Sequence, residues 1–338
     1  MIGRRFDLFT LFGVKVRVDS SWLIVVAMFS WLLSNSFAAR YPDLPTATHW
    51  MMGLTGVLGL FSSVVLHEFG HAIMARQMGV SIRGITLFFF GGVAEMDSEP
   101  RGPGAEFMVA VAGPAVSFLL GVGSFVIYGL LWGTAASPAA LAVIEYLGYI
   151  NFLLLIFNLI PAFPLDGGRV LRSILWAWKR DLRWASSIAS QIGRGFGIFL
   201  IGFGIFEMLV RQDFVGGLWM CLIGMFLKNA AQSSYRQVLL RRGLEGEKVS
   251  RFMQTDFVAV PRAASVAELV QDYVYKHQHK LFPVVDHERL VGCVSTQQIK
   301  ELPQSEWERQ TVGTIAVPCT SSNTVAPASD AAAAMTLM

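Results

Sequence analysis

The feature that most constrains this chain is His67-Glu68-Phe69-Gly70-His71, which lies inside a long apolar run. Ionisable side chains are costly within a bilayer and usually mark function there. Histidines at positions i and i+4 lie on one face of a helix, close enough to bind one metal ion. Glu68 lies beside that face and can act as general base for a water that the metal activates. The motif therefore predicts metal-dependent hydrolysis inside a membrane.

The composition predicts a membrane domain followed by a soluble tail. The 338 residues are 54% hydrophobic and 15% charged, with a mean hydropathy of +0.51, whereas soluble domains contain about 25% charged residues. The apolar excess stops near Lys228. A net charge of +3 fits membrane flanks better than a nucleic-acid-binding face, so we expect no nucleic-acid partner. The three cysteines form no C-x-x-C pair, which argues against a thiolate zinc site.

Six apolar segments have the length needed to cross a lipid bilayer, about 20 residues or a little more. They cover residues 20–38, 50–76, 105–133, 139–162, 192–210 and 214–231. Arginine and lysine are concentrated at the N-terminus, in every second connection and in the tail. By the positive-inside rule, this alternation predicts a multi-pass protein of the cell membrane with both termini in the cytosol. The histidine pair then lies near the cytosolic end of the second span.

Two further segments predict β-structure. Residues 11–18 alternate in a strand-like way, so we expect residues 1–19 to form a strand pair and the next segment to be a retained anchor rather than a signal peptide. Residues 81–97 are apolar but too short for a helical span, and their β-branched and aromatic residues with a Gly91-Gly92 break predict a hairpin. An edge strand at membrane depth could pair with an extended peptide, and we expect substrate to add along residues 86–93. The alternative is an amphipathic surface loop.

A catalytic zinc site usually has three protein ligands and one open position, so a third ligand is needed. His49 lies at the opposite end of the second span, Glu145 lies towards the external end of the fourth, and the remaining histidines are in the tail. Asp166 follows two prolines at the cytosolic end of the fourth span, at the depth of the histidine pair. It is the strongest candidate for the third ligand.

These motifs together resemble the site-2 protease family of intramembrane zinc metalloproteases. The resemblance covers about residues 8–231 and rests on H-E-x-x-H, on the segment Asn158 to Arg169 (N-x-x-P-x-x-P-L-D-G-G-R), and on Gly91-Gly92-Val93-Ala94 and Ala112-Gly113-Pro114. It implies a polytopic α-helical membrane fold with a membrane-associated β-hairpin.

The resemblance also implies roles for individual residues. His67, His71 and Asp166 would bind one zinc ion per chain, and Glu68 would activate water. Asn158 would face the catalytic centre and bind the scissile carbonyl, with Gly91 and Gly92 also near substrate. Alternatively, Asn158 caps backbone groups that the nearby prolines leave unpaired.

The C-terminal region resembles a CBS (cystathionine β-synthase-type) domain, a soluble α/β module, because of its strand–helix–strand–strand–helix order. We expect a transmembrane protease domain at 1–232, a linker at 233–246 and the CBS-type domain at 247–338, with an apparently incomplete second repeat from Val312. CBS pairs bind adenosine nucleotides, and Gly292 and Ser295 fit that signature, but Gln298 replaces its ribose-binding aspartate. A homo-oligomerisation or substrate-docking module is the alternative.

The main hypothesis is an intramembrane zinc endopeptidase that acts in regulated intramembrane proteolysis. Its substrates would be transmembrane or membrane-associated proteins, such as an anti-sigma or pro-sigma factor. The first alternative is a CBS-regulated transporter or channel, although such proteins more often show internal repeats with interrupted helices, which this sequence lacks. The second is a metal-dependent scaffold without catalysis, which an intact Glu68 argues against.

Overall fold

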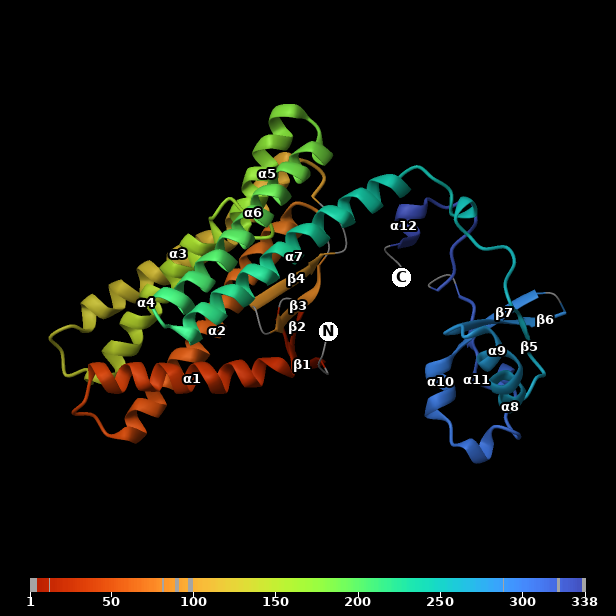
Figure 1. Cartoon of the computed structure of the whole chain (residues 1–338), viewed down its shortest axis with the longest axis horizontal. Helices are drawn as coiled ribbons and strands as arrows, with labels where there is room; N and C mark the ends of the chain where they lie inside the picture. The colour runs from red at the N-terminus through yellow and green to blue at the C-terminus, as the bar shows by residue number, and fades with distance from the viewer. Residues whose placement is uncertain are drawn as a thin grey trace. The chain divides into compact units, whose positions relative to one another are not determined.

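The computed structural model describes residues 5–11, 13–80, 82–88, 91–96, 100–287, 289–320 and 323–335. Positions 81, 89, 90 and 97 of the predicted hairpin segment, residues 1–4 and 12 of the predicted strand pair, and residues 321, 322 and 336–338 of the expected second CBS repeat lie outside these ranges. The chain divides into two compact units, Met1–Leu239 and Leu240–Met338 (Figure 1). Each unit is described by itself.

The first unit is a helical bundle (Figure 1). Its long helices are α1 (Ser21–Arg40), α2 (Thr46–Gln77), α3 (Pro103–Leu131), α4 (Pro138–Asn158), α6 (Leu182–Val210) and α7 (Phe214–Leu244). In the part of the chain that is described, these six are long and apolar enough to cross a membrane. The six predicted spans are therefore confirmed, and the protein is a multi-pass membrane protein.

The bundle is apolar on its outside and partly polar on its inside. Large apolar side chains such as Leu130, Leu209 and Ile24 are mostly exposed. Polar side chains are buried between the helices, among them Ser30, Ser34, His49, Ser63, Asn151 and Ser190. A lipid solvent explains this distribution, because apolar side chains can face lipid while most polar groups are kept away from it inside the bundle.

A short helix, α5 (Asp166–Lys179), follows α4 and was not predicted from the sequence. The fourth span ends at Asn158 rather than at 162, and the chain turns through a loop before α5 begins. A Cβ atom on Gly167 would collide with the carbonyl oxygen of Leu159, and one on Gly168 with the backbone of Phe163. The two glycines after Asp166 therefore allow α5 to pack directly on the preceding loop.

A four-stranded sheet covers one side of α2. Its strands are β1 (Arg5–Leu11), β2 (Val14–Asp19), β3 (Ile82–Phe88) and β4 (Gly91–Met96), in that order across the sheet. The predicted strand pair and hairpin are confirmed, since β1–β2 and β3–β4 are antiparallel, and β2 pairs with β3 in parallel. Val14, Val16 and Ile85 form a buried cluster with Phe69 of α2, which fixes the sheet beside the H-E-x-x-H motif.

The second unit contains a four-stranded sheet and short helices. The elements are β5 (Val260–Pro261), α8 (Val266–Glu268), α9 (Tyr275–His277), β6 (Leu281–Asp286), β7 (Arg289–Ser295), α10 (Thr296–Glu301), α11 (Val312–Ile315), β8 (Val317–Pro318) and α12 (Ala331–Met335). Val260, Phe282, Val284 and Val294 lie at the centre of its buried core. The predicted strand–helix–strand–strand–helix order is present. Residues 233–246, expected to be a linker, largely continue helix α7 to Leu244.

Candidate metal centre

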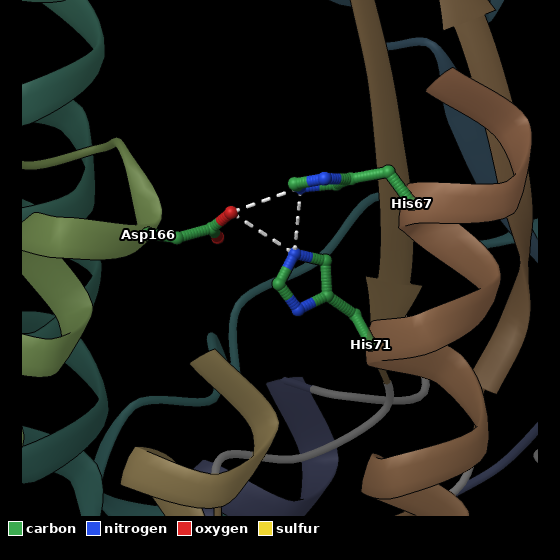
Figure 2. Close-up of side chains that lie close together, drawn as sticks. All are labelled: His67, His71 and Asp166. Atoms are coloured by element: carbon green, nitrogen blue, oxygen red, sulfur yellow. Dashed lines mark hydrogen bonds and ion pairs between the residues drawn. The ribbon is translucent and has the colours of Figure 1, made fainter. Parts of the chain in front are cut away.

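Three side chains from two distant segments meet inside the first unit (Figure 2). His67 and His71 project from one face of α2, and Asp166 projects towards them from the first residue of α5. Oδ2 of Asp166 lies 3.0 Å from Nε2 of His67 and 3.1 Å from Nε2 of His71, and the two Nε2 atoms are 3.2 Å apart. All three residues are buried.

This donor set fits a zinc ion. Two imidazole nitrogens and one carboxylate oxygen are ordinary zinc ligands, with bonds of about 2.0–2.2 Å. In a tetrahedral site such ligand atoms lie about 3.3 Å from one another, close to the separations of 3.0, 3.1 and 3.2 Å found here. Three protein ligands also leave a fourth position open, as catalytic zinc sites require.

Helix α3 contacts both imidazole rings at Nδ1, the ring nitrogen that does not face Asp166. Nδ1 of His71 lies 2.7 Å from the carbonyl oxygen of Val109, and Nδ1 of His67 lies 2.8 Å from Oγ of Ser117. A carbonyl only accepts, so Nδ1 of His71 carries the proton and Nε2 keeps its lone pair for a ligand. Partners of this kind fix the tautomer and orientation of metal-binding histidines. The sequence analysis did not identify either partner.

Glycines let the helices approach closely at the same place. A Cβ atom on Gly113, midway between Val109 and Ser117, would collide with the Nε2 atom of His71. One on Gly70 would lie 2.9 Å from the carbonyl oxygen of Ala112, so glycine in the H-E-x-x-H motif allows α2 to contact α3. The space beside the Nε2 atoms is therefore kept open. In the sequence, the four-residue spacing of Gly113 and Ser117 was the signal that both lie on the face of α3 that meets the histidines.

Glu68 lies on the side of α2 that faces the sheet. A Cβ atom on Gly92 would lie 2.8 Å from Cγ of Glu68, so β4 contacts this side chain. Glu68 is half-buried and is not one of the three clustered donors. Glu68 therefore follows His67 directly in the chain but takes no part in the donor cluster.

The other predicted site residues are less closely tied to the cluster. Asn158 is the last residue of α4 and is half-buried, and its side chain makes no hydrogen bond with the described residues. Gly91 begins β4, next to Gly92. A different asparagine, Asn151, is buried between helices and donates to Oγ of Ser63 at 3.0 Å. The sequence analysis did not single it out.

Comparison with known families gives two matches. The profile described as Peptidase family M50 matches residues 55–139 and 130–200, which contain the histidine pair and Asp166. The CBS domain profile matches residues 249–304 in the second unit.

Individual proteins are also similar over most of the chain. "Putative zinc metalloprotease sll0528" from Synechocystis sp. is 36% identical over 310 residues, which is 90% of this chain and 80% of the relative. "Putative zinc metalloprotease Rip3" from Mycobacterium tuberculosis is 33% identical over 316 residues, 93% of this chain and 80% of the relative. The solved structure of a site-2 protease from Methanocaldococcus jannaschii has a TM-score of 0.47 and 28% identity, and covers 68% of this chain and 94% of that one.

Six helices long and apolar enough to cross a membrane, together with a buried cluster of two histidines and an aspartate, are the features that a membrane-embedded metalloprotease requires. The two relatives named as putative zinc metalloproteases are matched over 80% of their own length. The chain belongs to peptidase family M50, the site-2 type of zinc metalloprotease, and carries a CBS domain at its C-terminal side.

Proposed function

We propose that His67, His71 and Asp166 bind one zinc ion per chain and that Glu68 is the general base of peptide hydrolysis. The observation that carries this proposal is the convergence of three buried donor atoms within 3.2 Å of one another. Zinc metalloproteases among the relatives support the choice of metal.

A zinc ion held by these donors supplies a Lewis acid that polarises the scissile carbonyl and makes water more acidic. The protein's own residues do the rest. Val109 and Ser117 orient the imidazoles, and Gly113 keeps the space beside them open. Glu68 takes a proton from the attacking water and passes it to the departing amine nitrogen, so that its carboxylate is restored. Asn158 is placed near the scissile carbonyl in this proposal.

Zinc binding is tested by removing one donor. We expect the detergent-purified protein to contain one zinc per chain, and His67→Ala to contain almost none, because two donors no longer complete the site. His49→Ala is the matched control, because His49 is a buried histidine at the other end of α2, bonded to the carbonyl oxygen of Tyr41. Elemental analysis measures both. Full zinc content in His67→Ala would exclude this residue as a ligand.

The substrates in this proposal are transmembrane or membrane-associated proteins, such as an anti-sigma or pro-sigma factor released by regulated intramembrane proteolysis. The basic residues of alternate connections support a cell-membrane protein with both termini in the cytosol. Under that orientation the metal centre lies nearer the cytosolic side, because His71 is only about 7 Å from Arg76 along the helix.

The order of strands in the first sheet determines which strand an extended substrate can pair with. Residues 86–88 belong to β3, which already has β2 and β4 as neighbours, so the expected addition along this strand does not fit. Within the described chain, β4 has a neighbour on one side only, and it also contacts Glu68 through Gly92. We therefore propose that unwound substrate backbone pairs with β4. This pairing satisfies peptide groups that have no water partner at membrane depth.

Proline substitutions test strand addition. Neighbouring residues of a strand direct their N–H groups to opposite sides, so either Val93→Pro or Ala94→Pro removes a donor from the open edge of β4. We expect that variant to keep its zinc and to cleave a synthetic transmembrane peptide with a raised KM. Leu8→Pro in β1, the opposite edge of the sheet, is the control and should leave KM unchanged. Unchanged KM in both zinc-loaded β4 variants would show that the helices alone hold the substrate.

For the CBS domain we propose docking or homo-oligomerisation rather than adenosine nucleotide binding. Gln298 is engaged in its own unit, because Nε2 donates to the carbonyl oxygen of Ile315 at 2.8 Å and Oε1 accepts from the backbone of Ser295. A neutral amide used in this way is a poor substitute for the aspartate that holds ribose. We keep the proposed domains at residues 1–232 and 247–338. The boundary between the two compact units, after Leu239, lies in the segment between these domains.

A further inference from the structure

A buried ion pair joins α3 to α5 outside the metal centre. Nε of Arg172 donates to Oε1 of Glu106 at 2.6 Å, and a terminal guanidinium nitrogen contacts the same oxygen. Glu106 is 1% exposed and Arg172 is 6% exposed. Buried pairs of this kind usually add little stability over apolar packing, so stability alone is a weak explanation for it.

Arg172 also holds the loop that leads into Asp166. Its guanidinium carbon lies 5.0 Å from the ring centroid of Phe163, within the range of a cation–π contact. The backbone of Phe163 is enclosed by Gly168 of α5 and Gly193 of α6, where a Cβ atom would collide with it. The loop, the start of α5 and Arg172 therefore form one packed block.

Helix α3 is the shared support of both halves of the metal centre. Val109 and Ser117 fix the rings of the histidine pair, and Glu106, less than one turn before Val109, fixes the block that carries Asp166. Among the described helices, α5 packs against α3 and α6. Helix α3 therefore sets the position of Asp166 relative to α2.

We propose that Glu106 and Arg172 are positioning residues that set the distance between Asp166 and the histidine pair, and thereby set the affinity for zinc. This inference rests on the proposed zinc ligation and adds a determinant that lies outside the ligand set. Neither residue touches the reacting atoms, so both act through the placement of Asp166.

The test uses variants that keep the charge of each side chain and change its length or shape. Glu106→Asp shortens the carboxylate side chain by one methylene, and Arg172→Lys removes the planar fork. Zinc affinity of the full-length protein in detergent is measured by competition with a chromophoric chelator. We expect both variants to bind zinc about 10-fold more weakly, the lower end of the loss seen when a group bonded to a metal ligand is removed, because these two residues act on Asp166 indirectly.

Glu145→Asp is the matched control, because Glu145 pairs with Arg40 across α4 and α1 at 3.1 Å, away from α5. Its zinc affinity should equal that of the wild type. The shift in unfolding temperature on adding zinc serves as a second measurement, since it reports affinity even in a destabilised variant. Wild-type zinc affinity in both test variants would overturn the inference. A wild type that binds no zinc would instead show that the proposed ligand set is wrong.

Discussion

Glu68→Gln is expected to lower peptide cleavage about 10²- to 10⁴-fold, the usual contribution of a general base. The amide has nearly the same shape as the carboxylate but cannot accept the proton of the attacking water. Glu68 is not among the three clustered donors, so zinc content should stay at one per chain. Cleavage of a labelled transmembrane peptide and elemental analysis of the same preparation measure both quantities.

The control for this variant is Glu207→Gln. Glu207 is another half-buried carboxylate of the bundle, paired at 3.5 Å with Arg211, the residue that follows the end of α6. Its loss should leave both cleavage and zinc content unchanged. If the Glu68→Gln variant cleaves at the wild-type rate, another group is the base and the proposed mechanism is wrong.

Asp166→Ala should lose both zinc and activity. Oδ2 of Asp166 is the only carboxylate oxygen in the described cluster, and it approaches both Nε2 atoms within 3.1 Å. Removing a supporting residue of a metal site weakens affinity about 10- to 100-fold, so removing a ligand should weaken it by more than about 100-fold. Chelator competition gives the affinity, and the peptide assay gives the activity.

Asp181→Ala separates ligation from local folding. Asp181 lies soon after α5 and caps α6 by accepting from the backbone of Arg183 and Trp184. Losing this cap costs about 1 kcal/mol of stability, yet the zinc content should not change. Should Asp166→Ala keep zinc at full stoichiometry, the third ligand must be a different residue.

Much of the fold follows from local patterns along the chain. Apolar runs of bilayer length predict the spans because each helix satisfies its own backbone in lipid, without help from a neighbour. The period of the α-helix places His67 and His71 on one face. Strand periodicity and the Gly91-Gly92 break predict both strand pairs of the first sheet, because a hairpin is formed by neighbouring segments.

The limits of sequence reasoning appear where distant segments meet. Residues 166–179 have the amphipathic period of a helix, so α5 itself was open to prediction, but its role was not, because that role depends on packing against α3 and α6. The parallel pairing of β2 with β3 turned the expected substrate edge into an interior strand. No local pattern encodes that pairing, since the two strands are separated by two transmembrane helices.

By itself, the sequence determined the chemistry that is available: two histidines one helical turn apart, a glutamate beside them and an aspartate after two prolines. Only the tertiary structure decided how these groups are held. It placed Asp166 at the first residue of α5, within 3.1 Å of both imidazoles, and made α3 the common support through Val109, Ser117 and Glu106. The physical reason is that the spacing of ligands from separate helices depends on packing between them, which is a property of the whole bundle.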